Sequence, residues 1–126
     1  MTREIIATSA APAAIGPYSQ AVSTGSLVYT AGQIGLNPAT GKMTEGIENQ
    51  ARQVMANLAA ILTAAGSSLD QVIKTTIFLQ DMADFAAVNA IYGAAFSATP
   101  PARSTVQVAG LPLGALVEIE AIALAG

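Results

Sequence analysis

The sequence contains neither cysteine nor histidine, and these two absences exclude several kinds of active site. Without cysteine the chain has no disulfide and no thiol nucleophile, and without histidine it has no Ser-His-Asp or Cys-His arrangement. A zinc site that lacks both residue types would be very unusual. Any chemistry must therefore use carboxylates, arginine, lysine, tyrosine, hydroxyl groups, backbone groups and water.

Charge is also scarce. Of the 126 residues, 52% are hydrophobic and only 10% are charged, whereas about a quarter of a typical soluble domain is charged. A small domain has a large surface for its volume, so we expect part of this surface to be covered. No uncharged apolar run of about 18 residues lacks turn formers, and the N-terminus has no continuous hydrophobic segment. The composition predicts one cytoplasmic domain, residues 1–126, that assembles with copies of itself and has no membrane partner.

The charge balance argues against nucleic acid as a partner. The chain has five Lys and Arg residues against eight Asp and Glu, which gives a net charge of −3. Binding to a phosphate backbone requires several basic side chains on one face, and the five here are scattered along the chain.

The hydrophobic patterns predict two helices and six strands. The first helix lies between a capping Thr44 and a terminating Gly66, with one apolar stripe at steps of three and four residues. The second opens at Asp81 or Asp84 and ends before Pro100. The predicted strands are Glu4–Ala7, Tyr18–Ser23, Ser26–Ile34, Val72–Gln80, Ala102–Ala109 and Leu116–Leu124.

This order, β-β-β-α-β-α-β-β, predicts an α+β domain whose helices cover one face of a sheet. The other face needs cover of its own, which we expect a neighbouring subunit to provide.

Three charges near the C-terminus require an explanation. From Phe85 onward the only charged side chains are Arg103, Glu118 and Glu120, all on apolar strands. Alternation along a strand puts Glu118 and Glu120 on one face, and we expect the two charged strands to be neighbours. One interpretation is a structural ion pair between Arg103 and a glutamate. The other is a pocket where Arg103 binds a ligand carboxylate bidentately and a glutamate positions water. Strand spacing alone leaves both open.

Other candidate residues are weaker when they are considered singly. Lys74 lies in an apolar strand, where a structural role is favoured over a Schiff base. Tyr18, in a loop, suits a pocket or ordinary packing equally, and Asn89 interrupts the inner face of the second helix. The glycines around Gly32 form no dinucleotide or phosphate-binding pattern.

Taken together, these residues resemble the Rid family (reactive intermediate deaminases, the YjgF-type proteins), particularly its RidA branch. The resemblance covers nearly the whole chain in order. It is carried by APAAIGPYSQAV at 11–22, TAGQIGLNPATGKM at 30–43, the long segment 50–92 from QARQVMANLAA to AAVNAIY, PPARSTVQVAGLP at 100–112 and VEIEAIA at 117–123.

The resemblance implies a chorismate-mutase-like fold with a mixed sheet and two helices on one face. It also implies a homotrimer with sites between subunits. Arg103 matches the arginine that binds the substrate carboxylate, and Glu118 the glutamate that orients the hydrolytic water, whereas Glu120 matches no catalytic position. Thr105, whose backbone N–H would help to hold the carboxylate, stands where many members have cysteine. The remaining substrate-binding matches are Tyr18, Gly32 and Asn89, and Ala31 replaces a frequent serine.

The implied activity is hydrolysis of small 2-imino or 2-enamino acids, such as 2-iminobutanoate and 2-iminopropanoate, to 2-oxo acids and ammonia. Such intermediates are released by pyridoxal-phosphate-dependent dehydratases, and their hydrolysis needs no cofactor and no metal. One alternative is a trimer that binds 2-oxo or amino acids without catalysis. A weaker one, because of the acidic charge and missing histidines, is an endoribonuclease or translation inhibitor.

Overall fold

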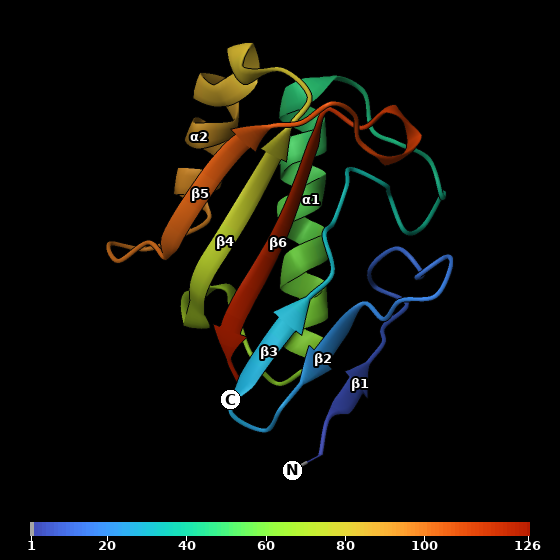
Figure 1. Ribbon diagram of the computed structural model, residues 1–126, viewed down its shortest axis with the longest axis vertical. Helices are drawn as coiled ribbons and strands as arrows, with labels where there is room; N and C mark the ends of the chain where they lie inside the picture. The colour runs from blue at the N-terminus through green and yellow to red at the C-terminus, as the bar shows by residue number, and fades with distance from the viewer. Residues whose placement is uncertain (1) are drawn as a thin grey trace.

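The computed structural model describes residues 2–126 and contains one six-stranded sheet (Figure 1). Its strand order is β1-β2-β3-β6-β4-β5, so β5 forms one edge and β4 separates it from β6. Strands β4 and β5 are parallel and all other neighbours are antiparallel. The strands are β1 (Glu4–Ile6), β2 (Ala21–Ser23), β3 (Leu27–Thr30), β4 (Val72–Leu79), β5 (Ala102–Gln107) and β6 (Val117–Leu124).

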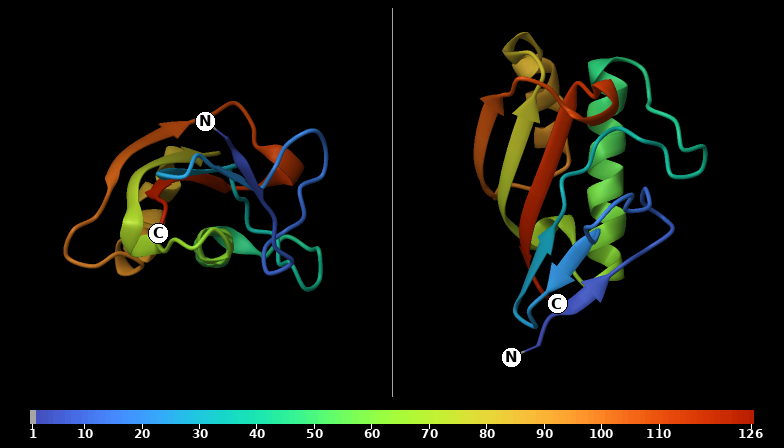
Figure 2. Two further views of the ribbon diagram at one scale, coloured as in Figure 1. Left: turned by 90° about the horizontal axis from the view of Figure 1, so that it is seen from below. Right: turned by 45° about the vertical axis from the view of Figure 1, so that its right-hand side comes forward.

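Both helices pack on the same face of this sheet (Figure 2). Helix α1 (Gly46–Ala64) buries its predicted apolar stripe against the sheet. Helix α2 (Phe85–Ala94) is the crossover that two parallel strands require, here between β4 and β5. Short 3₁₀ turns occur at Leu69–Gln71 (η1), Met82–Asp84 (η2) and Pro112–Gly114 (η3). The predicted element order, the mixed sheet and the placement of both helices on one face are confirmed.

The opposite face of the sheet carries no helix. Along β6, Val117, Ile119 and Ala121 are buried beneath the helices, and the residues between them point to the other side. Large apolar side chains are exposed on that side: Ile5, Tyr29, Val106 and Leu124. We call it the open face. Among residues 2–126, no helix is both long enough and apolar enough to cross a membrane.

Several predicted boundaries were wrong near the N-terminus. Strand β2 begins at Ala21 rather than Tyr18. Strand β3 ends at Thr30, and beyond it Gln33 keeps only an isolated bridge to Ile119 of β6. Thr44 does not cap α1: its hydroxyl donates to the carbonyl oxygen of Gly35 at 3.0 Å, and Glu45 occupies the N-cap position. Gly66, with a φ of 78°, follows the helix end as predicted.

Candidate functional site

A hollow of about 530 Å³ lies beside the start of β6 and contains three of the predicted site residues. Tyr18, Gly32 and Glu118 line it, and Ala31 stands next to Gly32 in the same wall. The other walls come from Pro12, Ala13, Ile15, Gln33, Ile34, Leu36 and, in the η3 turn, Pro112 and Leu113. Glu118 is the one charged side chain in this otherwise largely apolar lining.

The contact between Gly32 and Glu118 is unusually close. A β-carbon built on Gly32 would lie 2.8 Å from Cδ and from Oε2 of the Glu118 carboxylate. Real β-carbons essentially never show such distances, so a side chain here would displace the carboxylate or the loop. The absence of a side chain at position 32 therefore gives the Glu118 carboxylate its place in the hollow.

Two buried polar side chains of α1 hold the loops around Glu118. Nδ2 of Asn57 donates to the carbonyl oxygens of Ile34 and Leu36 at 3.1 and 3.0 Å. Oε1 of Gln50 accepts the backbone N–H of Leu116 at 2.8 Å, just before β6 begins. Because both amides are buried, losing either would leave polar backbone groups without partners. The rigid helix thus fixes the loops that frame the hollow.

Apolar side chains stand exposed at the rim of the hollow. Ile15 is 82% exposed and Leu113 is 74% exposed. Leu113 also has a φ of 56°, the left-handed region that a leucine adopts only with strain of about 1–3 kcal/mol. Strained backbone and exposed apolar groups on one rim indicate a surface that contacts another molecule.

Arg103 lies elsewhere, on the edge strand β5, and it is held from the helix side. Its Nη1 donates to Oδ1 of Asn89 at 2.7 Å. Its guanidinium carbon lies 5.5 Å from the ring centre of Phe85 and 5.1 Å from that of Tyr92. Because the three α2 residues lie at steps of four and three, they form one stripe of the helix. We call Phe85, Asn89 and Tyr92 the arginine cradle.

Tyr92 anchors the cradle in the core. Its hydroxyl lies 2.6 Å from Oγ1 of Thr75, and both residues are buried. Burial raises the pKa of Tyr92, while the Thr75 hydrogen bond and the positive charge of Arg103 oppose that rise. The phenol therefore stays neutral at physiological pH, and Arg103 contacts an uncharged aromatic ring rather than a phenolate.

Thr105 follows Arg103 on the same side of β5. Its Oγ1 is the one buried side-chain polar atom among residues 2–126 that has no hydrogen-bond partner. Such an atom costs free energy unless a partner is supplied. Thr105 thus belongs with Asn89 and Arg103 in a second group of predicted site residues.

The two groups lie on opposite faces of the sheet. Strand β4 also lies between their strands, so the prediction that the charged strands are neighbours was wrong. Arg103 of β5 pairs in register with Thr75 of β4, whose side chain is buried beneath the helices. Glu118 of β6 pairs in register with Phe78 of β4, whose side chain points to the open face. Paired residues share a face, and β4 separates the two strands. Among residues 2–126 the one ion pair within 4.0 Å joins Arg52 to Glu48, so Arg103 makes no such pair with Glu118 or Glu120.

The environment of Glu118 suits a base. Burial, and to a smaller degree the negative charge of nearby Glu120, raises the pKa of Glu118 above the ordinary value for glutamic acid. A carboxylate with a raised pKa accepts a proton more readily near neutral pH. No group of three or more acidic residues among residues 2–126 is arranged to hold a metal ion.

The aromatic members of the cradle were missed as functional residues. Phe85 and Tyr92 are predicted from the sequence only as inward-facing core side chains. Their spacing with Asn89 placed all three on one stripe, but only the crossover of α2 above β5 shows that this stripe meets Arg103.

A protein-family model described as endoribonuclease L-PSP matches residues 8–125 of the chain. The chain belongs to this family. It is the Rid or YjgF-type family that the sequence resembles, so that prediction is confirmed.

Relatives in the family are similar over nearly all of the chain. A mouse (Mus musculus) protein named 2-iminobutanoate/2-iminopropanoate deaminase is 50% identical over 98% of this chain and 93% of its own length. An Arabidopsis thaliana protein named Reactive Intermediate Deaminase A, chloroplastic, is 52% identical over 96% of this chain, which spans only 65% of that relative's length. The crystal structure of E. coli TdcF with bound serine has a TM-score of 0.92 at 46% identity, covering 98% of this chain and 99% of TdcF.

Proposed function

We propose that the protein is an enamine/imine deaminase, which hydrolyses small 2-imino acids to 2-oxo acids and ammonia in sites between the subunits of a homotrimer. One observation carries this proposal. The chain holds Arg103, which has no carboxylate partner among residues 2–126, on the helix side, and holds Glu118 in a hollow on the open face. Neither half is complete, so a second copy is needed to bring them together.

The Arg103 half suits the carboxylate of the substrate. The cradle leaves the guanidinium without a carboxylate partner in its own chain, among residues 2–126. A charge-assisted bond from arginine to a carboxylate contributes about 1.5–3 kcal/mol. The backbone N–H of Thr105 and the amide of Asn89 would complete this pocket. The relative that binds serine supports the assignment, because serine carries an α-carboxylate.

The Glu118 half suits the hydrolytic water. The imine carbon is already electrophilic, so the protein needs mainly to position the reactants. Glu118 takes a proton from water as the water oxygen bonds to the imine carbon, which gives a carbinolamine. Glu118 then returns that proton to the nitrogen, the C–N bond breaks to release ammonia, and the hydroxyl loses its proton to Glu118 as the C=O bond of the 2-oxo acid forms. Tyr18 and Gly32 would line the substrate's path in the same hollow.

A coupled assay tests the activity. Threonine dehydratase generates the imine, and its ultraviolet absorbance is followed with and without the protein. We expect faster loss of the imine signal with the protein, and a matched preparation of Glu118→Gln serves as the control. A protein that is stabilised by pyruvate but leaves the imine signal unchanged would be a binding module. Cleavage of RNA without imine hydrolysis would favour the nuclease alternative.

The assembly has its own test. Light scattering at micromolar concentration is expected to give the mass of a trimer, since the open face and the rim residues Ile15 and Leu113 expose apolar groups. A stable monomer would remove the proposed site between subunits. Cytoplasmic location and the absence of nucleic-acid and membrane partners remain predictions.

A further inference from the structure

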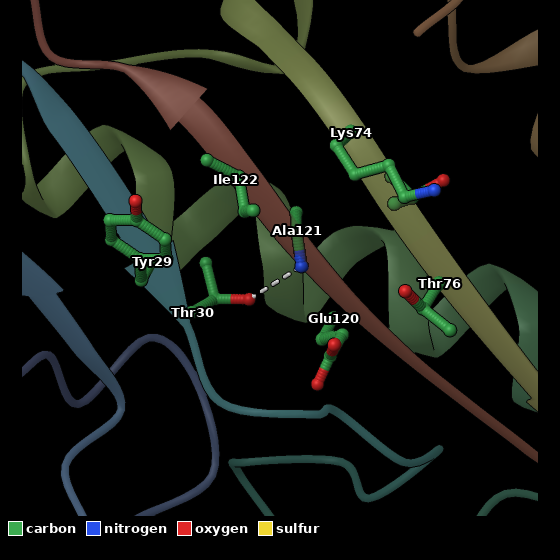
Figure 3. A pocket seen from close by; sticks show the side chains of 8 residues that line it. Tyr29, Thr30, Lys74, Thr76, Glu120, Ala121 and Ile122 are labelled. Atoms are coloured by element: carbon green, nitrogen blue, oxygen red, sulfur yellow. Dashed lines mark hydrogen bonds between the residues drawn. The ribbon is translucent and has the colours of Figure 1, made fainter. Parts of the chain in front are cut away.

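Two opposite charges on the open face lie outside both halves of the candidate site. Lys74 on β4 and Glu120 on β6 line one small hollow there, together with Tyr29, Thr76 and Ile122 (Figure 3). Neither charge has an ion-pair partner within 4.0 Å among residues 2–126. Nζ of Lys74 instead donates to Oγ of Ser104 on the edge strand β5, at 3.2 Å.

These charges stand among apolar groups that need cover. Tyr29 is 44% exposed and Val106 is 43% exposed on the same face. Any molecule that covers the apolar groups also removes water from the two charges between them. A charge that loses water without gaining a partner is strongly destabilising. An occupant that brings an anion to Lys74 and a cation to Glu120 compensates both charges. A second copy of this chain has both.

The register places the two charges next to the two halves of the site. Lys74 precedes Thr75, the residue that pairs with Arg103, and its hydrogen-bond partner Ser104 follows Arg103. Glu120 lies two residues beyond Glu118, on the same face of β6. An approach that brings the β5 edge of one copy to the Glu118 hollow of another also brings Lys74 toward the partner's β6.

We propose that Lys74 of one copy pairs with Glu120 of the next copy around the trimer, and that this pair sets the register in which Arg103 and Glu118 meet. The inference rests on the proposed site between subunits. A buried ion pair adds little net stability compared with apolar residues of the same size, but it rejects arrangements that oppose like charges. In a closed ring, each interface uses the lysine of one copy and the glutamate of its neighbour.

A charge exchange tests the pairing. Lys74→Glu and Glu120→Lys are made singly and together, and the trimer–monomer equilibrium is measured by analytical ultracentrifugation. We expect each single variant to dissociate at a concentration at least about 10-fold above that of the unmodified protein. The double variant should return to within about 3-fold of it, because its exchanged charges attract again. Arg52→Glu, which makes the same charge change in an exposed pair on α1, is the matched control and should stay trimeric.

The possible results are distinct. A trimer unaffected by either single exchange, or a double variant as weak as the sum of the singles, would overturn the pairing. If the single variants do not fold, the milder Lys74→Met and Glu120→Gln are compared with the double exchange, which must still fold and assemble. If the charge exchange behaves as expected but no imine is hydrolysed, the pairing stands and the proposed activity fails. If imine is hydrolysed and the exchanges have no effect, the reverse holds.

Discussion

Gly32 lies against the carboxylate of Glu118 so closely that a β-carbon at position 32 would stand 2.8 Å from Cδ of that carboxylate. The loop bearing Gly32 cannot easily retreat, because the next residue exchanges two backbone hydrogen bonds with Ile119, at 2.9 and 3.1 Å. The side chain of Glu118 is therefore the part that must move when position 32 gains an atom.

Gly32→Ala should lower kcat by about 10- to 100-fold while leaving the thermal midpoint nearly unchanged, since misplacing a reacting group by about 1 Å has costs of this size. The imine assay and a melting curve on one preparation measure the two quantities. Gly110→Ala is the matched control, because a β-carbon there meets no atom within 4 Å and should change neither. Wild-type turnover in Gly32→Ala would show that the position of Glu118 is not critical.

Glu118→Gln should abolish turnover but keep binding of a 2-oxo acid such as pyruvate. The amide fills the same space and cannot take a proton from water. The fold raises the pKa of Glu118, so it favours the protonated form. Protonated Glu118 therefore contributes to the stability of the fold at a pH below the ordinary pKa of glutamic acid. This contribution is lost as the pH rises through the raised pKa of Glu118. At neutral pH the amide should not lower the melting temperature. Loss of both binding and turnover would assign Glu118 to substrate binding.

At a protein concentration that keeps the trimer intact, Glu120→Gln should retain most activity and change its pH dependence. The negative charge of Glu120 contributes, after burial, to the raised pKa of Glu118. As pH falls, kcat/KM declines when Glu118 in the free enzyme gains its proton. Removing the Glu120 charge lowers that pKa, so the decline should shift to lower pH. A profile of kcat/KM against pH for both proteins measures the shift, and an upward shift would contradict the assignment.

The fold was largely predictable because its signals are local. The apolar stripe of α1 and the β-branched run of β4 each specify an element without distant information. The order of the strands is not local. The sequence places β5 and β6 next to each other in the chain, but the crossover through α2 pairs β5 with β4, and β6 enters on the other side of β4. The prediction that the strand of Arg103 and the strand of the glutamates are neighbours was wrong for this reason.

Arg103, Glu118 and the other residues of the predicted site were named from the sequence. Their separation into two groups on opposite faces of the sheet was not predicted. Sequence patterns and the family resemblance named Arg103 and Glu118 together, and neither says that one chain holds them on opposite faces of the sheet. The aromatic rings beneath Arg103 were hidden for a different reason. Phe85 and Tyr92 have the same spacing as ordinary core residues, and only the tertiary packing brings the Arg103 guanidinium against their rings.

Substitutions at Tyr92 separate the ring from the hydroxyl. Tyr92→Leu removes the ring under Arg103 and should raise KM several-fold with a smaller change in kcat, because a cation–π contact is worth about 0.5–2 kcal/mol. Tyr92→Phe keeps the ring and should keep KM, but it leaves buried Thr75 without its 2.6 Å partner and should cost about 1–3 kcal/mol of stability. Equal KM values in the two variants would deny Tyr92 a positioning role.

Arg103→Lys distinguishes the two interpretations of this arginine that the sequence left open. Among residues 2–126 the structural ion pair has no support, since the partners of Arg103 there are an amide oxygen and two aromatic rings. Lysine keeps the positive charge and can still reach Asn89, but it lacks the planar fork that binds a carboxylate through two hydrogen bonds. We therefore expect folding and assembly to survive.

The expected result is a melting temperature close to that of the unmodified protein, loss of imine hydrolysis by a factor of about 100 or more, and loss of the stabilisation that pyruvate gives. Melting curves with and without pyruvate, beside the coupled assay, measure all three on one preparation. Arg52→Lys is the control, because Arg52 lies in an exposed helical pair with Glu48 and should change none of them. An Arg103→Lys protein that melts far lower yet keeps its specific activity would make the arginine part of the scaffold. Arg103 has no carboxylate partner among residues 2–126, and this favours the clamp, because a bound substrate carboxylate would supply that partner.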